Sequence, residues 1–429
     1  MDLDVAIIGC GSAGGAAALL LARQGHRVTV YEAVDDPKPV GAGIVLQPTG
    51  LGVLHRLGLY ERVVGRGAII DRLYCRTVSG RVVIDLSYAE LAPSLFGLGI
   101  HRGALFDALF GAVRSEPGVT LRCGCPIDSF AAAGDSGRGV ERRWLVDARG
   151  RRHGPHELVI VADGARSQLR DDLEHLVVRA ARYPWGALWF VADDPGGLGF
   201  DRTLTQVVEG TRAFLGLLPT GLGARGEKPL LSLFWSLHGD RVTHFRRAGL
   251  RAFREQVLRY EPRAAPIIEQ VPDIDALLFA PYYDVVMSRW HWGNCVFVGD
   301  AAHATSPQLG QGANLALYDA AVLADCVAEL DSPRALPEAL ARYTRARRAH
   351  LGFYQRMTRW LTPFFQGESR ALAAMRDYGM GLSRFFAPLR RAMVATMAGV
   401  RLGFVRPSMR LSDVRAALPP RTARRGPTD

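Results

Sequence analysis

A glycine-rich turn close to the amino terminus places the strongest constraint on how this chain can fold. The apolar run from Asp4 to Ile8 predicts a buried strand, the run to about Arg23 predicts a helix, and Arg27 to Tyr31 predicts a second strand. The sequence GCGSAG, residues 9–14, joins the first strand to the helix. In this arrangement the first glycine permits a tight turn, the second lets a pyrophosphate approach the backbone, and the third lets the helix pack on the strand.

The second strand ends in Glu32, which lies at about the distance from the turn at which a carboxylate reaches the ribose hydroxyls of an adenosine. A glycine turn alone is weak evidence, and a turn without a ligand is the plain alternative. The combination of the strand, the turn, the helix, the second strand and the terminal acid predicts a dinucleotide site. The acid favours an unphosphorylated ribose, which FAD and NAD both have. The residues expected to form this site are Gly9, Gly11, Ser12, Ala13, Gly14 and Glu32.

Another strand, loop and helix follow one another between Asn294 and Ala321. Cys295 to Val298 is apolar on both faces and predicts a buried strand, which runs into Gly299 and Asp300. A carboxylate at the carboxyl end of such a strand faces the crevice in which ligands of open sheets bind, and it suits sugar-like hydroxyls. Pro307 restricts the loop, and the glycine-rich start of the next helix offers free N–H groups to a flat ligand. Taken alone, the segment is also consistent with an ordinary connection.

Two further motifs lie between these segments. Arg102 precedes an apolar-periodic helix, Ala104 to Val113, and a guanidinium there can pair with a pyrophosphate in two-pronged geometry. The buried strand Leu158 to Ala162 ends in Asp163, whose carboxylate can accept hydrogen bonds from backbone or ligand groups. Taken singly, Arg102 is equally consistent with a solvated charge, and Ser167, in the turn after Asp163, with a structural role.

Together these motifs resemble those of the class A flavoprotein monooxygenases, the aromatic-ring hydroxylase family with the p-hydroxybenzoate hydroxylase-like fold, over roughly residues 1 to 350. The resemblance implies FAD as the resident cofactor, with Asp300 on the ribityl chain, Pro307 beside the flavin ring and Arg102 in contact with FAD. It implies a role for Asp163 in binding both FAD and NAD(P)H. It also implies that the start of the last helix faces the isoalloxazine through Gly312, Ala313 and Asn314.

The same resemblance implies the reaction. NADH or NADPH reduces the FAD, O₂ is captured as a flavin C4a-hydroperoxide, and one oxygen atom is transferred to an aromatic, phenolic or quinone-like small molecule. Pro307 and the N–H groups around Gly312 are expected to shape the reactive site, and we expect no side-chain catalyst and no metal ligands.

Three alternatives to this reaction stay open at this point: a flavin-dependent halogenase, a prenyl-lipid reductase, and a flavoprotein that shelters a labile intermediate without turning it over. Trp290-His291-Trp292 resembles part of the halogenase tryptophan motif. The only lysines of the chain are Lys38 and Lys228, which puts a catalytic lysine in doubt.

The expected architecture is α/β, a Rossmann-type FAD-binding domain with an inserted antiparallel substrate sheet and a carboxyl-terminal helical extension. Strand patterns rich in aromatic residues run from Arg182 to Tyr283, and such a sheet over the flavin would form an aromatic-lined pocket. The candidates to face this pocket include Trp185, Phe234 and Tyr282, with Trp189, Trp235, His238 and Tyr283 as the selected substrate residues. We expect four divisions: 1–180 for FAD binding, 181–285 for the substrate sheet, 286–340 for the second FAD segment and 341–429 for the extension. Some strands within 69–100 are expected to belong to the substrate sheet.

The formal net charge is +11, and the whole positive excess lies near the carboxyl terminus. Leu340 to Asp429 holds 18 arginines, no lysine and four acids, so the remainder is slightly acidic and a nucleic-acid partner is not supported. Apolar helices with a basic face can make peripheral contact with an anionic membrane, cover the catalytic core or form a homodimer contact. We expect Pro363 and Pro388 to break or kink these helices, and Pro419 to Asp429 to be disordered.

Cysteine usage and hydropathy bear on the cellular setting. Six scattered cysteines without a C-x-x-C pair favour a reduced, cytoplasmic environment, with peripheral membrane association as an open alternative. No uninterrupted apolar segment reaches the roughly 18 residues that span a membrane. The Gly/Ser/Ala-rich stretch from Ala131 to Gly139 is expected to be a mobile hairpin tip.

Overall fold

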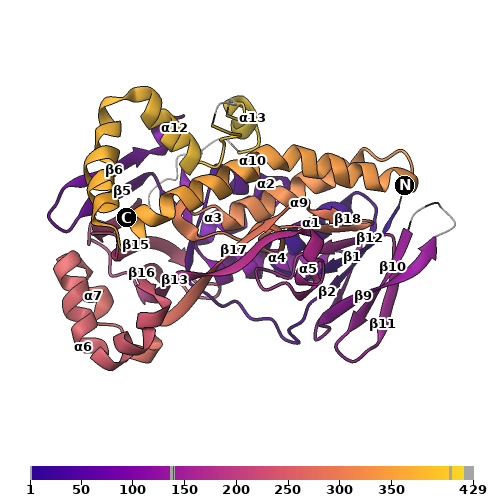
Figure 1. Cartoon of the computed structure of the whole chain (residues 1–429), viewed down its shortest axis with the longest axis horizontal. Coiled ribbons are helices and arrows are strands. Elements are labelled where there is room, and N and C mark those ends of the chain that lie inside the picture. Colours follow the sequence, from indigo (N-terminus) through magenta and orange to yellow (C-terminus); the bar gives the residue numbers. More distant parts are fainter. Residues whose placement is uncertain (1, 136–138, 140, 405–407, 420–429) are drawn as a thin grey trace.

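The computed structural model describes residues 2–135, 139, 141–404 and 408–419. A six-stranded sheet forms its centre (Figure 1), and all neighbouring strands are parallel except the edge pair β18 and β19. Across the sheet the order is β18 (His291–Trp292), β19 (Cys295–Phe297), β12 (Leu158–Val161), β1 (Asp4–Ile8), β2 (Arg27–Tyr31) and β8 (Val119–Arg122). Strands β12 and β19 are buried throughout, as expected for apolar strands covered on both faces.

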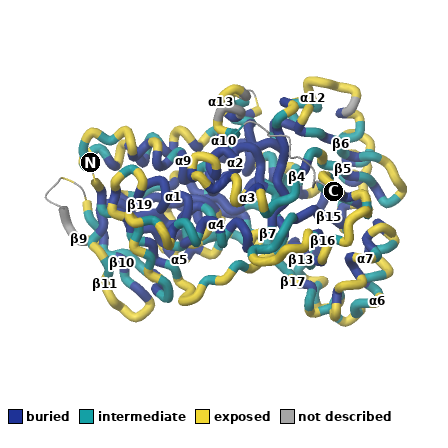
Figure 2. The backbone as a smooth tube through the Cα atoms, turned by 180° about the vertical axis from the view of Figure 1, so that it is seen from behind, coloured by how far each residue is buried: buried dark blue, intermediate teal, exposed yellow. Residues whose placement is uncertain are grey.

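Helices cover this sheet and hold the motifs in place. Helix α1 (Ser12–Arg23) packs against α4 (Arg102–Ser115) and α9 (Gly312–Ala328), and α10 (Leu336–Phe365) packs on α9. Because β1, β12 and β19 are neighbours in the sheet, the three loops that leave their carboxyl ends meet at one edge. The predicted α/β class is confirmed, and Figure 2 shows the most buried backbone in the middle of the molecule around α1.

A separate three-stranded antiparallel sheet lies beside the central one (Figure 1). It consists of β9 (Ile127–Asp135), β10 (Glu141–Asp147) and β11 (Arg152–His156), and β11 contacts β1. The expected hairpin tip therefore starts later than predicted, because the strand continues to Asp135. Residues 136–138 and 140 of that tip lie outside the described residues.

The substrate sheet has seven strands. Its order is β17 (Leu278–Met287), β13 (Val177–Asp193), β16 (Pro229–His238), β15 (Ala213–Leu222), β14 (Thr203–Glu209), β5 (Arg72–Thr77) and β6 (Val82–Ser87). The sheet is antiparallel as expected except at one pair, because β14 runs parallel to β5. The hairpin of β5 and β6 comes from a distant part of the chain, so no short turn forces an antiparallel direction on it.

Smaller elements join these sheets. Strands β3 (Gly43–Leu46), β7 (Gly97–His101) and β4 (Ala68–Ile70) form a further sheet, followed or flanked by α2 (Pro48–Arg56) and α3 (Tyr60–Arg66). Helix α6 (Val242–Tyr260) bends at Gly249, whose φ is 80°. The short helices α5 (Gln168–Asp171), α7 (Ala265–Ile268) and α8 (Asp300–His303) complete this part of the chain.

The carboxyl-terminal region is helical, as predicted, but its prolines act differently from one another. Helix α10 ends at Phe365, two residues after Pro363, in keeping with a break there. Pro388 instead occupies the first turn of α12 (Ala387–Met397), where its missing N–H costs nothing, and the chain leaves the helical conformation at Phe386 just before it, in keeping with the expected break. Helices α11 (Arg370–Ala374) and α13 (Leu411–Ala416) flank α12 along the chain, and residues 420–429, predicted to be disordered, lie outside the described residues.

Candidate active site

One continuous cavity of about 1340 Å³ joins the carboxyl edge of the central sheet to the substrate sheet. Its wall includes residues from every predicted cofactor motif, namely Gly11, Ser12, Ala13, Arg102, Asp300, Pro307, Gly312 and Ala313, and from the turn beside Asp163. The opposite wall is made by side chains of the substrate sheet, among them Trp189, Phe234 and Tyr283. The structure therefore brings segments that are far apart in the sequence to the wall of a single cavity.

The glycine turn at the start of α1 leaves space for a phosphate group. A Cβ atom added to Gly11 would meet no heavy atom within 4 Å, whereas one added to Gly14 would lie 2.0 Å from the carbonyl oxygen of Gly9. The third glycine therefore serves close packing, and the second borders open space. No side chain caps α1, so the N–H groups of its first turn face the cavity at the positive end of the helix. This cradle fits a pyrophosphate.

The Asp300 carboxylate is exposed to the same cavity. Among the described residues its side chain makes no hydrogen bond or ion pair, so both oxygens remain available to ligand hydroxyls. A Cβ atom on Gly312 would lie 3.9 Å from Asp300 Oδ1, which places the uncapped start of α9 next to the carboxylate. Asp300 thus meets the chemical requirement of a ribityl-binding group.

A buried ionic network that the sequence reasoning missed holds the Asp300 segment. Asp319, on α9, accepts a hydrogen bond from the backbone N–H of Gly299 at 2.9 Å and lies 2.5 Å from His303 Nε2. Its other oxygen accepts from Arg347 Nε at 2.7 Å. The two contacts of one oxygen lie at the two ends of α8, so Asp319 clamps the short helix that begins with Asp300.

The charge state of Asp319 follows from its partners. Burial by itself would raise the pKa of this carboxyl, but the neighbouring His303 and Arg347 outweigh burial and lower it well below its usual value. Asp319 has no exposed surface, so the ion pair with Arg347 is fully buried. The signal in the sequence was an acid in the middle of an apolar run, LALYDAAVLA, which pattern reasoning can recognise only when its partners are known.

Five predicted cofactor residues lie outside the cavity wall, and four of them, Asn314, Gly9, Gly14 and Glu32, hold the surrounding backbone in place. Asn314 is buried and bonds to protein, since its Oδ1 accepts from Gln47 N and its Nδ2 donates to Val45 O and Gly310 O. It therefore ties α9 to the loop after β3. Gly9 and Gly14 serve the tight turn. Glu32 accepts from the backbone N–H of Cys10 at 2.9 Å and so fastens the end of β2 to the glycine turn.

Asp163 also lies just outside the cavity wall. Its chain neighbours Ala162, Gly164 and Ala165 line the cavity, and Asp163 itself is exposed. Arg170, from the same turn, is buried and donates to the carbonyl oxygens of Ala165 and Ala301. This turn therefore packs against the Asp300 segment.

The substrate sheet presents only part of its predicted residues to the cavity. Trp189 and Phe234 are paired across β13 and β16, their ring centroids lie 5.0 Å apart, and both line the cavity. Trp235 follows Phe234 and points to the other face, where it packs against Phe253 and Tyr260 of α6.

The remaining two selected residues differ in position, since His238 ends its strand and Tyr283 lies in the middle of β17. His238, the last residue of β16, contacts Trp185 and accepts from the N–H of Asp240, away from the cavity wall. Tyr283 lines the cavity together with Tyr282. A register shift between β13 and β17 falls at this point, which lets two consecutive residues share one wall.

The carboxyl-terminal segment closes the cavity. Met380, Leu389, Met393 and Met397 belong to its wall, together with Phe404. Residues of α12 also form a buried cluster with β6 and the residues after it, among them Val394 with Leu86. Covering the core, one of the three roles left open by the sequence, is therefore part of what this segment does.

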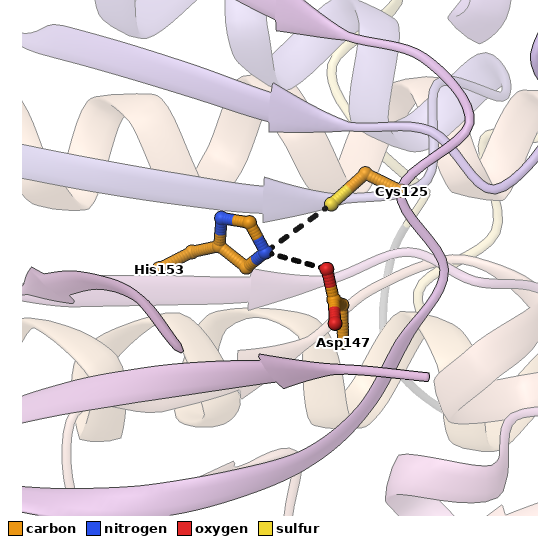
Figure 3. Close-up of side chains that lie close together, drawn as sticks. All are labelled: Cys125, Asp147 and His153. Carbon is orange, nitrogen blue, oxygen red and sulfur yellow. Dashed lines mark hydrogen bonds and ion pairs between the residues drawn. The ribbon is translucent and has the colours of Figure 1, made fainter. Parts of the chain in front are cut away.

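A second cluster consists of Cys125, Asp147 and His153, and none of these three residues lines the cavity (Figure 3). His153 Nε2 lies 2.9 Å from Asp147 Oδ2 and 3.6 Å from Cys125 Sγ, so one ring nitrogen points between the two partners. These three ligand types lie close enough together to hold a metal ion. The Asp147 oxygens already accept from the N–H groups of Arg149 and Arg151 and from Arg151 Nε, which explains the cluster as the support of the turn between β10 and β11.

Comparisons with known proteins identify the family of this chain. A family model described as FAD binding domain matches residues 2–357. The aurachin C monooxygenase/isomerase of Stigmatella aurantiaca is 30% identical over 352 residues, which cover 80% of this chain and 85% of that protein. A probable 2-heptyl-3-hydroxy-4(1H)-quinolone synthase of Rhodococcus erythropolis is 28% identical over 359 residues, with 82% and 85% covered.

Solved structures show the same fold. PqsL of Pseudomonas aeruginosa, a probable FAD-dependent monooxygenase, superimposes with a TM-score of 0.72 at 24% identity, with 90% of this chain and 100% of that chain covered. HpxO of Klebsiella pneumoniae, in complex with FAD, has a TM-score of 0.75 at 21% identity, with 94% and 100% covered.

Proposed function

The chain belongs to the FAD binding domain family and is an FAD-dependent monooxygenase, and from this premise we propose that it hydroxylates an uncharged aromatic ring that carries a bulky apolar substituent. NADH or NADPH supplies the electrons and O₂ the transferred oxygen atom. Two of the relatives are named for a 2-heptyl quinolone and for aurachin C. We therefore take a 2-alkyl-4-quinolone as the substrate class to test first.

The observation that carries this proposal is the wall of the cavity on the substrate side. Among the described residues, no lysine, arginine, aspartate or glutamate of the substrate sheet lines it. The charged wall residues are Arg102 and Asp300, which belong to the cofactor motifs, and Arg401 of the carboxyl-terminal segment. A buried carboxylate without a partner costs several kcal/mol, so the wall of the sheet disfavours acidic substrates.

Two polar groups on this apolar wall can orient a ring. Burial raises the pKa of Tyr282, so its hydroxyl stays protonated and can donate a hydrogen bond to a carbonyl oxygen. The Gln366 amide is bonded at one end to Ser236 Oγ at 2.8 Å, and its other end has no partner among the described residues although it is buried. A ring with both an acceptor and a donor, as in a 4-quinolone, would satisfy both groups.

The chain supports the reaction by positioning. When FAD is bound, it supplies the redox chemistry that activates O₂. The first turn of α1 would hold its pyrophosphate and Asp300 its ribityl hydroxyls, while Asp319 keeps Asp300 in place. Pro307 and Gly312 lie on the wall between these groups and the substrate sheet. The apolar wall excludes water from the reacting ring.

A halogenase reading gains no support from the cavity. Both lysines are surface residues in ion pairs, Lys38 with Asp36 and Lys228 with Asp193, and neither lines the wall. The two relatives and PqsL are named as monooxygenases or a synthase, and none of the three is named as a halogenase or a prenyl-lipid reductase.

The test is substrate-stimulated NAD(P)H oxidation with product analysis under ¹⁸O₂. We expect a 2-alkyl-4-quinolone to stimulate oxidation and to gain one labelled oxygen, and the same ring with a carboxylate in place of the alkyl chain to do neither. Efficient hydroxylation of the carboxylated ring, or a product without label, would overturn the proposal.

A further inference from the structure

Exposed apolar side chains gather in one region of the molecule. Of the twelve large apolar side chains that are exposed in the described part of the chain, eight lie between residues 360 and 404. We call these eight the carboxyl-terminal patch: Trp360, Met375, Tyr378, Leu382, Phe385, Phe386, Leu389 and Phe404. The segments that carry most of them contact one another, and in Figure 2 the turn before α12 is drawn mostly in the colour of exposed residues. Single exposed apolar residues are ordinary, but a group of this kind marks an interaction surface.

The patch is continuous with the catalytic cavity. Trp360, Met375, Leu389 and Phe404 are each more than half exposed, and all four also line the cavity. The same side chains therefore face the solvent and the cavity, so the cavity reaches the surface within the patch. Whatever covers the patch also covers this opening.

Two arginines lie close to patch residues in the sequence, Arg370 before Met375 and Arg391 after Leu389. Arg370 and Arg391 are exposed and have no ion pair among the described residues. The acids nearby in the sequence are already engaged, since Glu368 lies within ion-pair distance of Arg212 and Arg241, and Asp377 pairs with the buried Arg376. The region therefore combines exposed aromatic and aliphatic side chains with arginines that have no ion pair among the described residues.

We propose that the carboxyl-terminal patch docks on the surface of an anionic lipid bilayer. Aromatic and aliphatic side chains with flanking arginines match the interfacial region of such a bilayer, where apolar groups enter the acyl boundary and cations meet the head groups. A second copy of the chain fits less well, because a two-fold contact through this surface would face arginines with arginines.

Among the described residues, no helix has the length and apolar character needed to cross a bilayer.

Docking in this way gives the cavity a supply of apolar compounds. The exposed part of its wall would rest against the lipid, and a substrate dissolved in the bilayer could enter without passing through water. The surface proposal stands on exposure and charge alone and does not depend on the hydroxylation proposed above.

The test is co-sedimentation of the FAD-loaded full-length protein with vesicles. We would compare vesicles made of equal parts phosphatidylglycerol and phosphatidylcholine with vesicles of phosphatidylcholine alone. We expect binding to the anionic vesicles that weakens with added salt, and weaker binding to the neutral ones. Replacing two exposed phenylalanines that do not line the cavity, Phe385→Ser with Phe386→Ser, should lower the bound fraction by about tenfold or more.

A matched control changes two exposed apolar residues elsewhere, Val34→Ser with Val178→Ser, and should leave vesicle binding unchanged. Arg391→Glu tests the charge separately and should weaken binding only to the anionic vesicles. Thermal unfolding and the molar mass in solution are measured for each variant. The proposal is overturned if the unchanged protein does not bind the anionic vesicles, if the control variant loses binding as strongly as the patch variant, or if the patch variant dissociates a dimer while vesicle binding is absent throughout.

Discussion

Two aspartates close to α8 should respond to substitution in opposite ways. Asp300 is exposed to the cavity and has no side-chain partner among the described residues, whereas Asp319 is completely buried and contacts Gly299, His303 and Arg347. We therefore predict that Asp300→Ala lowers the affinity for FAD and leaves the stability of the apoprotein unchanged. Among the described residues the fold makes no contact with this carboxylate, whereas our proposal gives it the ribityl hydroxyls of FAD to bind.

The magnitude follows from the kind of bond that is lost. A hydrogen bond between a charged group and a hydroxyl contributes about 1.5–3 kcal/mol, so the Kd for FAD should rise about 10- to 150-fold in Asp300→Ala. The free energy of unfolding of the apoprotein should change by less than about 0.5 kcal/mol, as for a solvent-facing side chain. Asp319→Ala should instead cost about 3–5 kcal/mol of stability, because it leaves Arg347 buried without its counter-charge.

The assay separates the two effects. FAD affinity is measured by titrating apoprotein and following quenching of flavin fluorescence, and stability is measured by urea unfolding of the same apoprotein. Asp300→Asn serves as the matched variant, since it keeps the size and one acceptor and should lie between the wild type and Asp300→Ala. The reasoning is refuted if Asp300→Ala binds FAD as tightly as the wild type, or if it destabilises the apoprotein as much as Asp319→Ala does.

Three further predictions concern the turn, the ring-orienting groups and pH. Gly11→Ala should weaken FAD binding at least about tenfold, because the added methyl enters the open space that the pyrophosphate needs, and it should leave the stability of the apoprotein unchanged. Gly14→Ala should instead lower the unfolding temperature of the apoprotein, because its added methyl meets a carbonyl oxygen at 2.0 Å. Equal shifts of the two unfolding temperatures in calorimetry would contradict this. Tyr282→Phe should raise the KM for a 4-quinolone by about 2- to 12-fold with FAD affinity intact, as expected for one lost hydrogen bond, and an unchanged KM in steady-state kinetics would argue against its contact with the ring. Because the folded-state pKa of Asp319 is depressed, its contribution to stability is present above the unfolded-state pKa of about 3.9 and is lost as the pH falls below it. The difference in unfolding free energy between the wild type and Asp319→Asn should therefore be constant above about pH 5 and shrink below pH 4. A difference that does not depend on pH would contradict the role given to Asp319.

Local sequence patterns were sufficient for the parts of the site that sit at strand ends. The run from Asp4 to Glu32 and the run from Cys295 to Asp300 each combine a buried strand with a turn whose residues have few conformational choices. The carboxyl ends of neighbouring parallel strands lie at one edge, so recognising the strands also placed the Gly11 turn and Asp300 on one cavity. The fold class followed from the same alternation of strands and helices.

The substrate wall shows where pattern reasoning stopped. A strand alternates between two faces, but its sequence does not say which set of residues faces the ligand when both sets are aromatic. Phe234 and Trp235 are adjacent and equally apolar, and only the packing of α6 against Trp235 decides that Phe234 faces the cavity. The same holds for Tyr282, which reaches the wall through a register shift that no local signal predicts.

Residues close together in the chain set the glycine turn, the position of Asp300 and the strand ends, because glycine conformation, helix starts and strand ends depend on local sequence. Contacts between distant positions depended on the tertiary structure: Asp319 meets Arg347 and His303, Asn314 bonds to the loop after β3, and Leu389 of the carboxyl-terminal helices lines the cavity. These contacts join positions whose distance depends on how separate elements pack, and packing is a property of the whole chain.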